Sequence, residues 1–232
     1  MQHSLHIEGF GIRLRPVRMS DAEMIVWLRN QDYVRGKLGD SATTVAAQEA
    51  WLAEYFARPN DYYFMIETLA GTPVGTHGLY HFSGTTAESG RFTIRPDVVA
   101  AVPSSILAFD LAFERLQLLE LVALCVATNH GIHSLNRKFG FKQDRIKPDA
   151  ITIGGKSADL IRFSLQAADW RDYRERLIPL AEFAEERIRC WDESRIDGRL
   201  MAREPAIPDV AAMAPVLISP PTTQLPLPAA PV

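Results

Sequence analysis

The sequence predicts an α/β fold of the α+β kind, with helices flanking a central, mixed and mostly antiparallel sheet. Residues 62–68 and 74–82 are rich in aromatic and β-branched side chains around a Gly/Pro turn, which indicates a hairpin. The continuous apolar run at 119–127 is typical of a strand buried on both faces. Because a predicted helix precedes that run, a β-α-β crossover results.

The elements before the hairpin follow from alternation and helical spacing. Residues 12–18 alternate as a strand does, and Ser20 or Asp21 can cap a helix that continues through Leu28. A second helix begins after Thr44 and ends before Pro59.

After the hairpin, residues 88–94 extend it into a meander. An apolar helix face runs from Ile106 to Leu116, after a Pro-Ser-Ser entry. A short helix ends at Gly140, and residues 159–165 close the sheet. The predicted order is β α α β β β α β α β.

The C-terminal part differs in composition from the rest. We expect a domain at 1–168, an amphipathic helical extension at 169–203 that is interrupted near Pro179, and a disordered tail at 204–232. The tail holds eight of the 15 prolines and no charge after Asp209. Packing on the domain's own core is the expected role of the extension; a homodimer contact or partner docking are the alternatives.

Composition excludes several classes of function. The net charge of −3 favours neither nucleic acid nor an anionic membrane as a partner. The two cysteines have neither disulfide nor zinc spacing, so a cytoplasmic protein without a metal is expected. The first residues lack the pattern of a secretory leader, and the prolines of the tail would break any membrane-spanning helix.

From Asn129 the chain reads NHGIHSLNRKFGF, which resembles the asparagine-to-GF signature of the GNAT superfamily of acyl-CoA N-acyltransferases. The segments IRLRPV, QEAWLAEYFARPNDYYFMIE and AESGRFTIRPD are similar to a branch often found with cell-surface polysaccharide biosynthesis, the nucleotide-linked amino-sugar N-acetyltransferases. The resemblance covers residues 12 to about 165. It implies a GNAT-like sheet and transfer of an acyl group from acetyl-CoA to an amine of a small, sugar-like acceptor.

The resemblance also implies where acetyl-CoA binds. Its pantetheine arm would lie along the edge of the family's fourth strand, and its pyrophosphate at the start of the following helix. The usual glycine-rich loop is replaced here by PDVVAAVPSS, in which small residues leave room and serines add donors. The cofactor-binding residues expected on these grounds are Phe92, Thr93, Ile94, Ala101, Ser104, Ser105 and Asn129.

The chemistry calls for a group that takes a proton from the acceptor amine, and Glu88 at the start of the fourth strand is the first candidate. Asn136 stands where many family members have a tyrosine that protonates the departing thiolate. Its amide can hydrogen-bond to the thiolate but cannot protonate it. The general acid is therefore unassigned.

Other polar residues have structural explanations that compete with functional ones. Arg29, Asn30 and His77 are candidates for acceptor binding, although an arginine at a helix C-terminus is favourable by itself. His77 and His81 are expected on one strand face together with Leu79. Two further expectations concern residues outside the site: Cys125 is buried, and His130 and His133 lie at the surface.

Two alternatives to an amino-sugar N-acetyltransferase remain. One is a protein N-terminal or aminoglycoside acetyltransferase. The other is a non-catalytic GNAT-like interaction module, favoured by the glycine-free loop and by Asn136.

Overall fold

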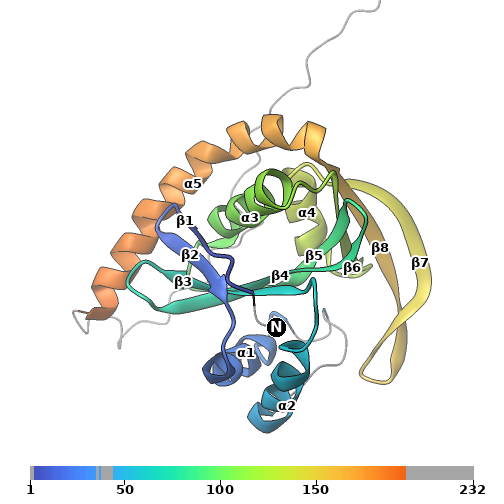
Figure 1. Cartoon of the computed structure of the whole chain (residues 1–232), viewed down its shortest axis with the longest axis horizontal. Coiled ribbons are helices and arrows are strands. Elements are labelled where there is room, and N and C mark those ends of the chain that lie inside the picture. The colour runs from blue at the N-terminus through green and yellow to red at the C-terminus, as the bar shows by residue number, and fades with distance from the viewer. Residues whose placement is uncertain (1–2, 35–36, 38–43, 197–232) are drawn as a thin grey trace, which may run out of the picture.

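A computed structural model describes residues 3–34, 37 and 44–196 (Figure 1). The predicted tail at 204–232 and the end of the predicted extension, residues 197–203, lie outside the described residues. The described part contains one sheet with the strand order β1-β2-β3-β4-β5-β6-β8-β7. The strands are β1 (Ile7–Gly9), β2 (Ile12–Pro16), β3 (Tyr62–Thr68), β4 (Pro73–Ser83), β5 (Thr86–Ile94), β6 (Glu120–Val126), β7 (Lys142–Ile153) and β8 (Lys156–Gln166).

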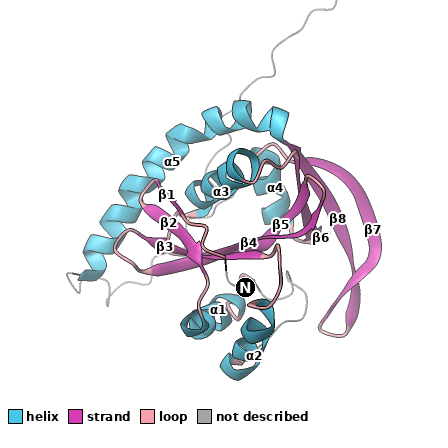
Figure 2. Cartoon of the chain, viewed as in Figure 1, coloured by secondary structure: helices cyan, strands magenta, loops and turns pink. Residues whose placement is uncertain are grey.

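Helices cover both faces of this sheet (Figure 2). On one face lie α1 (Ala22–Arg29) and α2 (Val45–Tyr55), and on the other lie α3 (Ala101–Asp110), α4 (His130–Lys138) and α5 (Ala167–Ile196). Short 3-10 and π-helical segments, Met19–Asp21 and Leu111–Arg115, precede α1 and follow α3. Each face has its own apolar core, the larger one under α3 and α5. The predicted fold class is confirmed.

One pair of strands departs from the antiparallel pattern. β5 and β6 run parallel and pair only from Thr86↔Glu120 to Glu88↔Val122, whereas all other neighbours are antiparallel. Beyond Glu88 no further pair joins them, so the sheet opens between the end of β5 and the end of β6. This opening sets the position of the candidate site.

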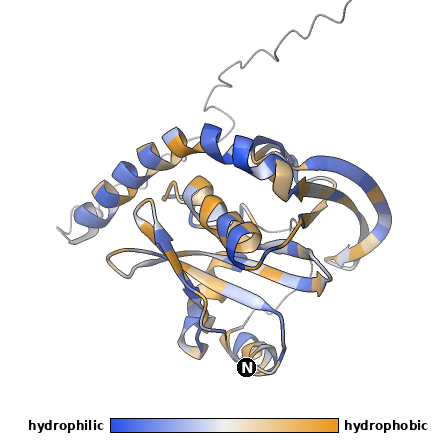
Figure 3. Ribbon diagram, turned by 45° about the horizontal axis from the view of Figure 1, so that its top comes forward, coloured by the Kyte–Doolittle hydropathy of each residue, from blue (hydrophilic) through white to orange (hydrophobic). Residues whose placement is uncertain are grey.

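The C-terminal helix α5 packs on the core of the domain. It buries Leu177, Ala181 and Ile188 beside α3 and continues through Pro179, so the predicted interruption is wrong. Buried side chains on both sides of the proline hold the helix in place although one backbone donor is missing. Figure 3 shows the apolar positions of α5 alternating with hydrophilic ones along its length. Its start also fits tightly against Gly140, where a Cβ would overlap the ring of Tyr173.

Three other features differ from the prediction. The short strand β1 and the long strand β7 were not predicted; β7 is mostly exposed and carries Pro148, so it lacks an apolar alternation. Helix α3 begins at Ala101, before the predicted Pro-Ser-Ser entry. Ser104 therefore lies inside the helix, where its hydroxyl donates a hydrogen bond to the carbonyl of Ala100 (2.7 Å).

Within the described residues no helix combines the length and apolar character needed to cross a membrane.

Candidate active site

Glu88 lies where β5 and β6 separate, because it forms the last pair of that parallel ladder. Both carboxylate oxygens are engaged. Oε1 accepts a hydrogen bond from the hydroxyl of Tyr80 (2.9 Å), and Oε2 lies 3.0 Å from Nδ1 of His81. Burial and the neighbouring carboxylate raise the pKa of Tyr80, so the phenol stays protonated and donates to Glu88 at neutral pH.

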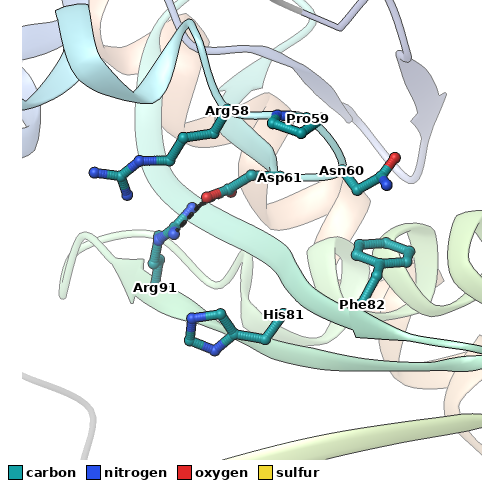
Figure 4. Close-up of a pocket in the computed structure, with 7 residues that line it drawn as sticks. All are labelled: Arg58, Pro59, Asn60, Asp61, His81, Phe82 and Arg91. Atoms are coloured by element: carbon teal, nitrogen blue, oxygen red, sulfur yellow. Dashed lines mark hydrogen bonds and ion pairs between the residues drawn. The ribbon is translucent and has the colours of Figure 1, made fainter.

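An open cleft of about 330 Å³ lies beside this group, on the face of the sheet that α1 and α2 cover. Its lining combines three basic side chains, one carboxylate and one aromatic ring with a short loop segment: Arg58, Pro59, Asn60, Asp61, His81, Phe82 and Arg91. In Figure 4 the carboxylate of Asp61 and the guanidinium of Arg91 point at each other, with the His81 ring below them in the view. Glu88 lies behind His81 and does not line the cleft.

Arg91 is held rigidly in the wall of the cleft. Its guanidinium makes a bidentate ion pair with Asp61 and lies 4.1 Å from the ring centre of Tyr80 and 5.2 Å from that of Trp51. The neighbouring Gly90 makes room for Tyr80, because a Cβ at residue 90 would overlap the tyrosine hydroxyl. The site is therefore pre-organised by packing and by a partly buried ion pair.

His77 and His81 do not share a face, contrary to the prediction. A register shift between Tyr80 and Ser83 forms a bulge, and His81 has a left-handed backbone (φ 53°). His77 is directed into the other core, where its ring contacts Phe92 and Phe109. Burial lowers its pKa to about 3, so this histidine is neutral. With 2% of its surface exposed and Ser89 Oγ 2.9 Å from Nε2, His77 is placed in the core and away from the cleft.

Asn136 and Cys125 form a contact behind the strand opening. The amide Nδ2 of Asn136 donates to Sγ of Cys125 (3.2 Å), and both residues are buried. Burial raises the pKa of the Cys125 thiol to about 11, which keeps it protonated and a poor nucleophile. The predicted burial of Cys125 is confirmed. The predicted role of Asn136 beside a departing thiolate stays a prediction, and it requires the amide to share or exchange its present partner.

The region expected to hold acetyl-CoA fits that ligand through its backbone more than through its side chains. The N–H groups of Ala101 and Val102, in the first turn of α3, have no carbonyl partner within the helix, and no side chain caps this helix start. Ser104 and Ser105 are buried. Arg95, at the base of the loop, forms an ion pair with Asp97 (2.9 Å). Anion binding there would rest on the helix N-terminus and the small side chain of Ala101.

The rest of the predicted site residues have varied surroundings. Phe92 contacts His77, Thr93 is buried, and the carbonyl of Ile94 accepts a hydrogen bond from Tyr33. Asn129 caps α4 by accepting from the N–H of Ile132 (3.4 Å).

At the end of α1, Arg29 has a buried Nε without a hydrogen-bond partner, and Asn30 is the C-cap residue. Neither lines the cleft. His133 is not at the surface as predicted: it is buried, with Nε2 2.9 Å from the carbonyl oxygen of Val126.

Four residues that shape the cleft were not among the predicted site residues, namely Arg58, Asp61, Tyr80 and Arg91. Arg91 pairs with a residue 30 positions away, and no local pattern indicates such a pair. The sequence did contain one signal for Tyr80. It lies near the end of β4, and the neighbouring strand β5 contains Glu88.

Comparison with known proteins supports this assignment of the fold. The model of the acetyltransferase (GNAT) domain matches residues 12–142. A GCN5-related N-acetyltransferase from Brucella melitensis superposes with a TM-score of 0.68 at 18% identity, covering 77% of this chain and 86% of that one. A search of curated proteins found no significant match.

Two further solved structures have different substrates in their descriptions. A mutant of the spermidine N-acetyltransferase SpeG from Vibrio cholerae has a TM-score of 0.61 at 17% identity, with 70% and 97% of the two chains covered. FdhC, a nucleotide-linked sugar GNAT, has a TM-score of 0.62 at 24% identity, with 78% and 99% covered. At these identities the likeness extends to the fold alone. Because the domain model spans more than half of the chain, the protein belongs to the GNAT acetyltransferase family and is an acyl-CoA-dependent N-acetyltransferase.

Proposed function

We propose that this enzyme acetylates an amine on a small acceptor that also carries negative charge, with a nucleotide-linked amino sugar as the leading candidate. The observation that supports this most directly is the charge of the cleft. Two arginines and one histidine line it against a single carboxylate, Asp61, which Arg91 already binds. Since Asp61 neutralises Arg91 and His81 is taken as neutral, Arg58 gives the lining one net positive charge, which favours a phosphate or carboxylate of an acceptor over a polyamine.

The shape of the cleft agrees with an acceptor larger than a simple amine. His81 lies near Arg91 and Phe82 lines the cleft on the side of Asn60, and rings of this kind can stack on a sugar or a base. Arg58 is the basic side chain best placed to meet an anion, because its contact partner Glu54 is an exposed helix neighbour 3.6 Å away. Such exposed pairs contribute little and exchange easily.

The reaction itself is direct attack of the acceptor nitrogen on the thioester carbonyl. The strand opening after Glu88 lies next to the cleft, so both substrates can meet there. The proton of the acceptor ammonium goes to the pair formed by Glu88 and His81. Asn136 lies on the thiolate side in this arrangement, as the resemblance implies.

Thiol release from acetyl-CoA tests the proposal, with separate assays of nucleotide-linked amino sugars, free amino sugars, aminoglycosides, peptides and spermidine. We expect turnover to be highest with an anionic amino sugar. Arg58→Gln should raise the KM of that acceptor about tenfold, which corresponds to about 1.4 kcal/mol, and leave the KM of acetyl-CoA unchanged. Arg187→Gln, an exposed charge change on α5, is the matched control. Highest turnover with spermidine or a peptide would overturn the proposal.

A further inference from the structure

His81 has the backbone strain and the position of a functional residue. Its φ of 53° lies in the left-handed region, which is uncommon for a histidine and is often retained at functional sites. The bulge after Tyr80 directs the side chain to the cleft, and the imidazole is 75% exposed. Glu88, with 16% of its side chain exposed, sits behind it. An acceptor that enters the cleft therefore meets His81 before it meets Glu88.

The contact between the two side chains determines which nitrogen carries the proton. An ionised carboxylate only accepts hydrogen bonds, so the 3.0 Å contact with Oε2 places the hydrogen of neutral His81 on Nδ1. The other nitrogen, Nε2, then has a free lone pair, and it has no hydrogen-bond partner among the residues that the structure describes. The hydroxyl of Tyr80 holds the second oxygen of Glu88 and keeps the carboxylate in this orientation.

We propose that Nε2 of His81 is the general base of the reaction and that Glu88 is a positioning residue that orients the imidazole and stabilises its charged form. A carboxylate behind a histidine performs these two roles in other enzymes. Imidazole is also the better base for an ammonium group near neutral pH, because its ordinary pKa is closer to the working pH than that of a carboxylate. The assignment rests on the proposed transfer to an amine.

Proton transfer to Nε2 precedes acyl transfer. One N–H bond of the acceptor ammonium breaks and an Nε2–H bond forms, which makes imidazolium beside the Glu88 carboxylate. The freed nitrogen lone pair attacks the thioester carbonyl, and the C–S bond then breaks with its electron pair on sulfur. The second proton of the attacking nitrogen goes to the thiolate, directly or through water. The exposed imidazolium returns its proton to solvent.

Charged and titratable groups from three elements lie around His81. Glu88 and Arg91 come from β5, Tyr80 from β4, and Arg58 and Asp61 from the segment after α2. Arg91 and Asp61 neutralise each other, so the carboxylate of Glu88 and the guanidinium of Arg58 are the charges that remain near the imidazole.

The test compares His81→Asn, Glu88→Gln and the double variant by steady-state kinetics with the acceptor found active. Asparagine tolerates the left-handed backbone, so folding should be retained. We expect kcat at pH 7 to fall about 10²-fold in His81→Asn, the low end of a general-base contribution, with the KM of acetyl-CoA unchanged. The acid limb of the pH profile should disappear. The double variant should be no slower than His81→Asn, because the two residues act as a unit. His6→Asn, an exposed histidine far along the chain, is the control.

If His81→Asn keeps kcat within twofold while Glu88→Gln loses it, then Glu88 is itself the base and the proposal is overturned. A nitrogen-15 NMR spectrum decides the same question without any acceptor. We expect the Nδ1–H tautomer of His81 in the wild type and the Nε2–H tautomer in Glu88→Gln, since an amide donor at residue 88 reverses the contact. The Nε2–H tautomer in the wild type would also overturn the proposal. Absence of turnover with every amine would instead count against the proposed function.

Discussion

The two faces of the sheet around β4 use the same kind of side chain in opposite ways. His77 lies on the α3 face, packed between Phe92 and Phe109, and burial lowers its pKa to about 3. His81 follows four residues later on the α2 face, exposed and in contact with a carboxylate. The register shift between Tyr80 and Ser83, one of two in this pair of strands, separates the two environments. One histidine is enclosed in the core, and the other is open to the cleft.

The same division extends to the rest of the molecule. The α3 face holds small or apolar residues and an uncapped helix start, which suits an extended thioester and its phosphates. The α2 face holds the charged cleft with its aromatic wall. Variants on the two faces should therefore affect different kinetic parameters, which allows the comparison to be tested one face at a time.

Among the effects that distinguish the two faces, the largest is expected on the KM of acetyl-CoA, from a variant on the α3 face. Ala101→Leu should raise the KM of acetyl-CoA by at least about tenfold, or about 1.4 kcal/mol, because the added bulk blocks the free N–H groups at the start of α3. The KM of the acceptor should not change. Ala53→Leu, at an exposed position of α2, is the control. An unchanged constant for acetyl-CoA in Ala101→Leu would place the pyrophosphate elsewhere.

A second prediction concerns the pH dependence of stability and His77. The unfolded chain protonates a histidine near its ordinary pKa of about 6.5, whereas folded His77 stays neutral down to about pH 3. The unfolded state therefore binds more protons below about pH 6.5, and stability falls as the pH decreases from there toward 3, by up to about 1.4 kcal/mol per pH unit.

His77→Leu should remove this part of the slope while kcat at pH 7 stays within twofold. Urea unfolding of both proteins at pH 7, 6, 5 and 4 measures the difference. Equal slopes in the two proteins, or a large loss of turnover in His77→Leu, would contradict the division between the faces.

The smallest effect is expected from Tyr80→Phe. This change removes one hydrogen bond to Glu88, worth about 0.5–1.5 kcal/mol, so kcat should fall about threefold. The pH at which activity is half lost should move more than the KM values do, because the orientation of the Glu88–His81 pair is what changes. Steady-state kinetics between pH 5 and 9 measure both, and an effect confined to KM would argue against this role for Tyr80.

The order of the helices and most strands could be predicted because they carry clear periodicity or caps. Thr44, for example, caps α2 as expected, accepting from the N–H of Ala47 (3.2 Å). β7 lacked a signal since its residues are mostly exposed. Pro179 falsely indicated a break in α5. The free energy gained by burying Leu177 and Ala181 exceeds the local cost of a proline inside the helix.

For the candidate site, the position of Glu88 at the strand opening was predictable through the resemblance, while its contacts were not. Strict alternation along β4 puts His77 and His81 on one face, and only the bulge reverses that. The pair of Arg91 and Asp61 depends on tertiary packing alone. The roles proposed for Glu88, His81 and Asn136 stay predictions until the variants are measured.

Competition between two acceptors tests the central claim most directly, because the product ratio reports the ratio of kcat/KM values. Equal concentrations of a nucleotide-linked amino sugar and spermidine would be mixed with limiting acetyl-CoA, and the acetylated products counted by mass spectrometry. The charged cleft predicts an excess of acetylated sugar of at least about tenfold, equivalent to about 1.4 kcal/mol. A product mixture dominated by acetylated spermidine would contradict it.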